Sequence, residues 1–407
     1  GSAAARYALH RLFVQRHGWQ VKGLEPGGES WAGTSPAAAL GEKLPESVRD
    51  LFEERVGSRG LDLHELAVLA STLENLIHGE SVSRLHVAYK LSNHSPTVAA
   101  LVQDEAFQVI DTYMALYILG ANVSSTPEAK LLRYVGNVSR WYPSWPETRR
   151  FLRNVQEEVV ASKEGLSFDN LTAVVEEAGE RFGRFQDAEC RTLKNDLVKL
   201  EEVPGNGRVR LADFYGSALH AGKWQFSESV EYLRELGALD ESNPGLLRVI
   251  IPNYVNSPSN CIASSAYYGV CCIDECEDLL GHFERRIGAP TARPAEIITL
   301  VSALPSASQS ANRTLPVALI SRLEEVAAHH NGRIPLHGRL FAQWLHHAYP
   351  HECPYPHVSG TTRPQRAEEW SAAGREAAAS KDEMQQHVEA GRSTRMQPTV
   401  EGGLCSA

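Results

Sequence analysis

Residues 207–214, Gly207-Arg208-Val209-Arg210-Leu211-Ala212-Asp213-Phe214, contain the arrangement that decides how we expect this chain to fold. A glycine turn is followed by a central aliphatic residue and then by the start of a helical pattern. The same arrangement recurs in three further segments: 59–66 (RGLDLHEL), 164–171 (EGLSFDNL) and 332–339 (GRIPLHGR). Helical periodicity flanks the copies, for example between residues 61 and 77, where apolar side chains form a broad stripe. The sequence therefore predicts a mainly α protein, a multi-helix body of paired helix–turn–helix units with little β structure.

The repeated arrangement resembles the EF-hand, a helix–loop–helix unit whose loop needs a turn at its sixth position, an aliphatic residue at its eighth and a ligand at its twelfth. Residues 84–91, followed by Leu101 and Glu105, resemble the entering helix and the loop end of a further copy. Together these segments cover about half of the chain. The separations of about 40 residues, from 61 to 101 and from 166 to 209, suit paired EF-hands.

The calcium chemistry of the EF-hand is missing from these loops. Calcium needs oxygen ligands at the first, third and fifth positions and a bidentate acid at the twelfth. In that order, three of the loops hold Glu54, Val56, Ser58 and Glu65; Glu202, Pro204, Asn206 and Asp213; and Ala327, His329, Asn331 and Gly338. We therefore expect EF-hand-like helix pairs with degenerate loops that do not hold calcium. The alternative is that glycine-punctuated helix pairs recur here without any relation to the EF-hand.

Three other segments, 6–19, 252–277 and 336–357, resemble an exported protein family of unicellular algae that has no assigned function. This resemblance implies export and a helical body. It lends no catalytic residue.

Shifts in composition divide the chain into five expected regions. These are an N-terminal arm at 1–45, a helical domain with a degenerate EF-hand-like pair at 46–146, a second helical domain at 147–245, a Cys/His-rich helical domain at 246–362 and a polar tail at 363–407. Pro143 and Pro146 set the boundary near 146, because proline interrupts a helical pattern. Residues 246–251 are the best strand candidate. In the tail we expect a solvent-facing helix at 367–388 and disorder from residue 389 onward.

The overall charge and hydropathy exclude two classes of partner. The net charge is −10, and a general nucleic-acid binder would instead show a basic face or tail. The only basic cluster of note, Arg149, Arg150 and Arg153, is typical of a solvated helix face. No apolar run approaches the roughly 18 residues that a membrane span needs. We therefore expect protein partners, with no nucleic acid and no membrane span within this chain.

Cysteines and glycosylation motifs favour the secretory pathway, with the protein secreted, extracellular or in an organelle lumen. Six cysteines are disulfide candidates: Cys190, Cys261, Cys271, Cys272, Cys276 and Cys353. The seventh, Cys405, lies in the polar tail, and we expect it to be unpaired. Five Asn-x-Ser/Thr motifs are candidate glycosylation sites: Asn93, Asn122, Asn137, Asn170 and Asn312. The start at Gly1-Ser2 suits either a trimmed chain or a mature end left after removal of a signal peptide.

The pairing of the cysteines stays partly open. Cys271 and Cys272 are adjacent, and so small a ring would strain a bond between them. We expect one of them to bond Cys261 or Cys276, and the other to reach Cys353 or Cys190.

Residues 346–357 contain the strongest candidates for chemically active side chains. Its candidate metal ligands are His346, His347, His351, Cys353 and His357. Neutral imidazole and thiolate suit zinc or copper, although no standard zinc-site spacing is present. The competing interpretation is that these histidines are ordinary partly exposed residues and that Cys353 is half of a disulfide.

Two other segments allow a functional interpretation. Cys261 at the start of a helix suggests a nucleophilic thiol, but an exported chain normally oxidises such a cysteine, so we favour a disulfide there. The segment from Trp141 through Tyr142 to Trp145 is a candidate partner-binding surface, with a buried domain junction as the alternative.

These observations predict a non-enzymatic interaction or scaffold module stabilised by disulfides. No catalytic residue is assigned, because the chain carries no nucleophile elbow, phosphate loop or dinucleotide-binding motif. The alternative is a metal-dependent enzyme or metal-binding protein that uses the His/Cys cluster at 346–357.

Overall fold

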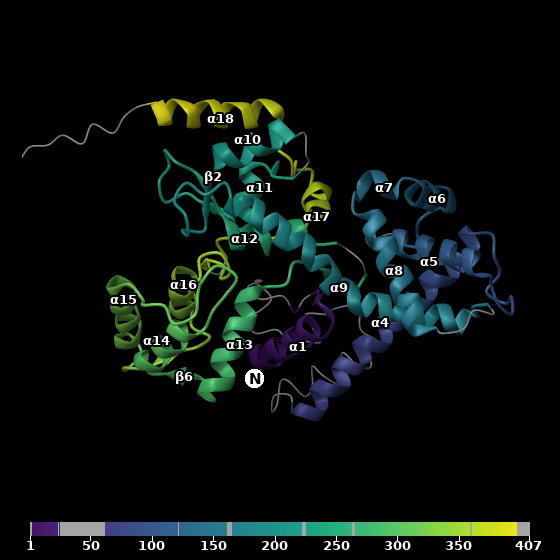
Figure 1. Ribbon diagram of the computed structural model, residues 1–407, viewed down its shortest axis with the longest axis horizontal. Helices are drawn as coiled ribbons and strands as arrows, with labels where there is room; N and C mark the ends of the chain where they lie inside the picture. Colours follow the sequence, from purple (N-terminus) through teal and green to yellow (C-terminus); the bar gives the residue numbers. More distant parts are fainter. Residues whose placement is uncertain are drawn as a thin grey trace, which may run out of the picture. The chain divides into compact units, whose positions relative to one another are not determined.

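Helices occupy most of the described chain, and strands are limited to short antiparallel pairs, so the predicted mainly α fold class is confirmed. The computed structural model describes residues 2–22, 24, 62–120, 122–160, 165–221, 225–262, 265–358 and 360–396 (Figure 1). Most of the predicted N-terminal arm, the start of the first repeat copy at 59–61 and Cys405 lie outside these residues. No helix among the described residues is both long and apolar enough to span a bilayer.

The chain divides into two compact units: residues 1–188 with 261–273, and residues 189–260 with 274–407. The division falls inside one long helix, α9, rather than at the boundaries near 146 and 245 that composition suggested. Pro146 stands at the start of helix α8, where proline is tolerated because the first helical N–H groups have no partner within the helix.

The first unit is helical except for one strand pair. Its elements are α1 (Ser2–His17), β1 (Trp19–Val21), α4 (Leu63–Leu91), α5 (Gln103–Ile118), α6 (Glu128–Gly136), α7 (Val138–Trp141), α8 (Trp145–Val159), the first part of α9 (Phe168–Val198) and β5 (Tyr268–Val270). Strand β1 pairs antiparallel with β5, with Gln20 opposite Gly269. A single core joins α1, α4, α5, α8 and α9, with Leu73, Ile110 and Phe182 fully buried.

The second unit contains the remaining strands. Its elements after α9 are β2 (Arg208–Arg210), α10 (Leu211–Ala221), α11 (Val230–Glu235), β3 (Leu239–Asp240), β4 (Arg248–Ile250), α12 (Ile251–Val255), the 3-10 turn Pro258–Asn260, α13 (Glu275–Ile287), β6 (Thr291–Ala292), α14 (Pro294–Ala303), α15 (Val317–Ala328), β7 (Ile334–Pro335), α16 (Arg339–Ala348), α17 (Ala367–Ala372) and α18 (Lys381–Met396). The three-stranded sheet has the order β2-β4-β3, and β6 pairs with β7. The predicted strand at 246–251 is thus real, although it is shorter and runs directly into α12.

The loops that follow the repeated arrangement meet in antiparallel pairs. In the first unit, Leu101 and Leu166 exchange two backbone hydrogen bonds of 2.9 Å. In the second unit, Val209 lies opposite Val249, and Ala292 lies opposite Ile334. The predicted pairing of the loop at 166 with the loop at 209 is therefore wrong. The loop at 166 pairs instead with the loop at 101. The loops around Val249 and Ala292, which form the other halves of the two pairs in the second unit, were not predicted.

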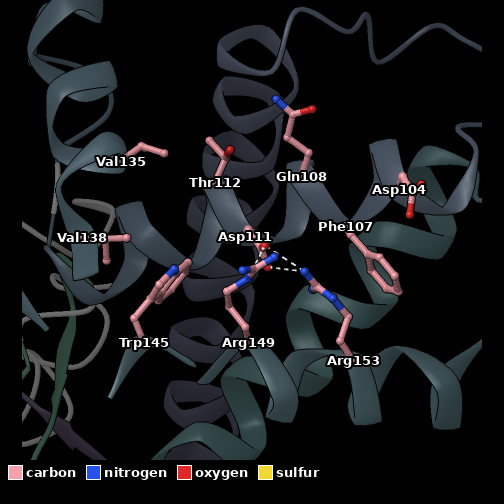
Figure 2. A pocket seen from close by; sticks show the side chains of 10 residues that line it. All are labelled: Asp104, Phe107, Gln108, Asp111, Thr112, Val135, Val138, Trp145, Arg149 and Arg153. Carbon is pink, nitrogen blue, oxygen red and sulfur yellow. Dashed lines mark hydrogen bonds and ion pairs between the residues drawn. The ribbon is translucent and has the colours of Figure 1, made fainter. Parts of the chain in front are cut away.

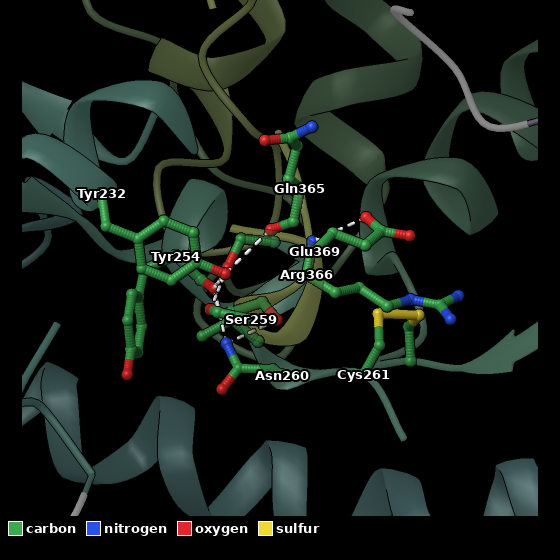
Figure 3. The surroundings of a disulfide bond; sticks show 11 residues. Tyr232, Tyr254, Ser259, Asn260, Cys261, Gln365, Arg366 and Glu369 are labelled. Carbon is green, nitrogen blue, oxygen red and sulfur yellow. Dashed lines mark hydrogen bonds between the residues drawn. A yellow bond between two sulfur atoms is a disulfide. The ribbon is translucent and has the colours of Figure 1, made fainter. Parts of the chain in front are cut away.

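The region expected to be a polar tail belongs to the second unit. Helix α18 lies along α10, as the yellow and teal ribbons show (Figure 1). Trp370 on α17 is 1% exposed and contacts the Tyr232 ring, and the Tyr232 hydroxyl donates to the Gln365 carbonyl (Figure 3). The solvated tail expected from residue 363 is therefore corrected, because Trp370 and Met384 supply buried apolar side chains that the polar composition concealed.

Six described cysteines are disulfide-bonded. Cys261 bonds Cys271 across ten residues, which is one of the pairings left open by the sequence (Figure 3). Cys276 bonds Cys353 across 77 residues. That second bond is not among the predicted pairings, in which one of Cys271 and Cys272 bonds Cys261 or Cys276 and the other reaches Cys353 or Cys190.

Candidate functional site

The loop acids are used to hold helices in place. Asp62 and Glu65 cap the start of α4 reciprocally, with N–H donation to the two carboxylates over 3.0 and 2.9 Å. The same offset of three residues recurs in other loops, where the later side chain accepts the earlier backbone N–H: Glu105 from Val102, Asn170 from Ser167 and Glu296 from Arg293. Residues in the twelfth loop position thus serve as helix caps.

The loop at 202–213 carries arginines beside its acids. Arg210 forms an ion pair with Glu202, the first loop position. Arg208 donates to Asp240 over 2.8 Å, and this bond joins strands β2 and β3. Because a guanidinium already neutralises Glu202, this loop satisfies its own charge without a cation.

The five candidate metal ligands at 346–357 do not converge. The described residues contain no group of three or more His, Cys, Asp or Glu side chains arranged to hold a metal ion. Cys353 is not available as a thiolate ligand because its sulfur is bonded to Cys276. The structure contains the competing interpretation, a disulfide at Cys353.

Three of the histidines have structural partners instead. The buried ring of His346 lies with Nδ1 2.7 Å from the Cys353 carbonyl, and burial lowers its pKa to about 4, so the ring is neutral at physiological pH. His351 Nε2 lies 2.7 Å from a carboxylate oxygen of Glu201, and both side chains are buried. His357 Nε2 lies 2.7 Å from the Gly237 carbonyl. His347 is on the exposed side of α16.

The segment 350–357, which we call the histidine strap, is seated on the paired loops of the second unit. Glycines at 207 and 237 leave room for it, since an added Cβ would lie 2.2 Å from the Pro350 carbonyl oxygen and 2.8 Å from the His357 ring. The side chain of Asn253 donates to the Tyr355 carbonyl and accepts its N–H. The strap therefore fixes these loops, and this explains why histidines concentrate there.

A pocket with a volume of about 440 Å³ lies in the first unit between α5 and α8 (Figure 2). Trp145, Arg149 and Arg153 line one wall because residues four apart share a helix face. Phe107 and Asp111 line the facing wall from α5. Val135 and Val138, from α6 and α7, close one end of the pocket (Figure 2).

The two arginines of the pocket share one carboxylate. Arg149 Nε donates to Asp111 over 2.8 Å, and Arg153 Nη2 donates to both oxygens of Asp111 over 2.8 and 2.7 Å. The Arg153 guanidinium also lies over the Phe107 ring, 3.9 Å from its centroid. Its Nη1 atom is buried and has no hydrogen-bond partner among the described residues. The pocket therefore combines apolar walls with a guanidinium whose hydrogen-bonding capacity is incompletely used.

The predicted partner-binding aromatics divide between the pocket, the core and the surface. Trp145 lines the pocket and is 8% exposed. Tyr142 is buried, and its hydroxyl donates to Gln186 over 2.8 Å. Trp141 is 64% exposed, with the Arg140 guanidinium 5.8 Å from its ring. The segment is thus partly core and partly available surface.

The sequence signalled half of this pocket. Arg149 and Arg153 belong to the basic cluster interpreted as a solvated helix face, and that interpretation holds for Arg150, which is exposed and paired with Glu147. Asp111 and Phe107 were missed because they lie on another helix with an ordinary amphipathic pattern. Only tertiary structure brings Asp111 to the arginines, which lie 38 or more residues away.

The predicted glycosylation sites differ in exposure. Asn93, Asn122, Asn137 and Asn312 are exposed, whereas Asn170 is half-buried and caps α9.

The chain matches no protein-family model, no curated protein and no solved structure.

Proposed function

We propose that this chain is a non-enzymatic interaction module of the secretory or extracellular space, built from EF-hand-like helix pairs without calcium. The observation that carries the proposal is the exposed Trp141, four residues before Trp145, which lines the pocket. Large aromatic side chains dominate the binding energy of protein interfaces. Trp141, with 64% of its surface exposed, offers an aromatic side chain of this kind to a partner.

Two further observations support the proposal. Antiparallel contacts join the helix–loop–helix units in pairs, and the acids of their loops are engaged by helix caps and arginines. The His/Cys stretch, which was the basis for a metal-dependent alternative, is engaged in structural bonds. Disulfide-bonded cysteines suit an oxidising compartment.

A displayed library of random peptides, selected against the oxidised full chain, tests the proposal. We expect enriched peptides with a Kd on the order of 10 µM, and Trp141→Ala should weaken their binding at least about tenfold. Val317→Ala is the matched control, because Val317 is an 80% exposed apolar side chain of the other unit. Selection of no peptide, or equal binding by Trp141→Ala, would refute the interaction surface.

A further inference from the structure

We propose that the pocket between α5 and α8 binds a carboxylate carried by a peptide segment with a neighbouring apolar side chain. The inference rests on the proposed function and adds the chemistry of the partner. It follows from the two guanidiniums, their shared carboxylate and the apolar walls around them.

The first step concerns the balance of the charges that line the pocket. Two guanidiniums face one carboxylate, Asp111, and this leaves an excess positive charge at the centre of the pocket. Asp104 also lines the pocket, but it lies at the edge beyond Phe107, away from the arginines (Figure 2). A second carboxylate would therefore be attracted to the arginines rather than repelled.

The second step is the hydrogen-bonding capacity. A guanidinium has five N–H donors, and bidentate geometry favours planar carboxylate ligands. Asp111 engages Nε of Arg149 and Nη2 of Arg153. Within the described part of the chain Nη1 of Arg153 is buried and unpaired, which costs free energy until an acceptor arrives. Asp111 and the Phe107 ring hold the Arg153 guanidinium in place, so little side-chain entropy is lost on binding.

The third step is the neighbouring apolar surface. Val135, Val138 and Trp145 line the end of the pocket opposite Phe107 (Figure 2). A volume of about 440 Å³ accommodates a carboxylate together with one side chain of the size of leucine. An inorganic anion would fill only the charged part and would leave this apolar wall uncovered.

A matched pair of small probes, N-acetyl-leucine and N-acetyl-leucinamide, tests the carboxylate requirement on the full oxidised chain. The probes differ only in the negative charge. Binding is followed through the Trp145 indole and arginine Nε–H signals in ¹H–¹⁵N spectra. We expect N-acetyl-leucine to bind with a Kd on the order of 1–10 mM, and the amide to bind at least about tenfold more weakly.

Arginine variants locate the site. Arg153→Gln should weaken N-acetyl-leucine binding about tenfold, and Arg149→Gln should weaken it less, because Arg149 is 54% exposed. Arg150→Gln is the control, since Arg150 lies on the same helix but pairs with Glu147 outside the pocket. Inorganic phosphate is the comparison anion, and we expect it to shift these signals less than N-acetyl-leucine does.

Several results would overturn the proposal. These are equal binding of both probes, binding by neither, equal loss of binding in Arg150→Gln, or phosphate binding as tight as that of N-acetyl-leucine. Peptides that bind through Trp141 without a carboxylate would leave the proposed function standing while this inference fails. If the library yields no peptide but N-acetyl-leucine binds, the small-molecule site would stand and the peptide carrier would be excluded.

Discussion

Val209 on β2 lies directly opposite Val249 on β4, and both side chains are fully buried. Each valine ends the loop of one helix–loop–helix unit, and the exiting helices α10 and α12 begin within two residues of them. This pairing makes the two loops one structural element. The histidine strap at 350–357 is seated on that element through Gly207, Gly237 and Asn253.

Substitution of Gly207 tests whether the strap depends on the close approach of the loop. Gly207 has a φ of 70°, and an added Cβ would lie 2.2 Å from the Pro350 carbonyl oxygen. We expect Gly207→Ala to lower the free energy of unfolding by about 3 kcal/mol or more. Gly205→Ala is the control, because its φ of 83° carries similar strain but no neighbouring atom lies within 4 Å. It should cost about 1 kcal/mol. Equal losses in chemical denaturation would show that the strap does not rest on this loop.

Replacement of His351 tests the buried ion pair with Glu201. Burial raises the pKa of Glu201, but the hydrogen bonds from His351, Gly205 and Gly207 outweigh burial and hold the pKa below its usual value. His351→Ala should cost roughly 3 kcal/mol because it leaves a buried carboxylate without its imidazole hydrogen-bond partner. His337→Ala, which removes a more exposed pair with Glu284, should cost less than about 1 kcal/mol.

The same pair sets an acid limit on stability. Because the folded pKa of Glu201 is depressed, its stabilising contribution is present above about pH 4.3, the unfolded value, and is lost as pH falls through the folded pKa. Glu201→Gln should therefore be less stable than wild type at neutral pH and approach it in acid. A stability difference that does not change with pH would contradict this assignment.

Glu228 has the opposite pH dependence. Burial raises its pKa to about 7, even though Tyr254 donates a hydrogen bond of 2.8 Å to its carboxylate. Because the folded pKa exceeds the unfolded one, the stabilising contribution is complete below about pH 4.3 and is lost as pH rises through about 7. Glu228→Gln should therefore gain roughly 2 kcal/mol over wild type between pH 5 and pH 8. Glu231→Gln, at an exposed position on α11, should show no such gain in thermal unfolding.

The disulfides Cys276–Cys353 and Cys261–Cys271 differ in the length of chain that they close. Cys276 and Cys353 are 77 residues apart, whereas Cys261 and Cys271 are ten apart. Closing a longer loop removes more entropy from the unfolded chain. We expect the double serine variant of the first pair to lose roughly 4 kcal/mol and that of the second pair roughly 3 kcal/mol. The reverse order in denaturant unfolding would contradict the entropic account.

The helical repeats could be predicted from the sequence because they rest on local signals. A glycine with positive φ, a following aliphatic residue and an amphipathic stripe are all visible at Gly165-Leu166 and Gly207-Val209. The pairing of the loops could not be predicted, since spacing alone does not distinguish 166 with 209 from 166 with 101. The loop at Ala292 was missed because its alanine and flanking prolines do not follow the pattern.

The candidate pocket was predicted less well than the fold. Trp145 and the arginine pair could be identified in the sequence. Asp111 could not, because it contacts the arginines only when α5 packs against α8. For the histidines, the sequence pattern suggested a metal site, whereas the structure shows structural contacts. His351 and His357 form an imidazole-rich motif in sequence, yet each one bonds a different loop, Glu201 in one case and Gly237 in the other.

The central claim is that the chemistry-bearing residues of the second unit are structural and that the chain functions through binding. Elemental analysis of the natively purified protein, combined with disulfide mapping of the same sample, tests it most directly. We predict no stoichiometric zinc or copper, and a peptide in which Cys276 is linked to Cys353. Near-stoichiometric metal together with a free Cys353 thiol would contradict the account and would restore the His/Cys cluster at 346–357 as a metal site.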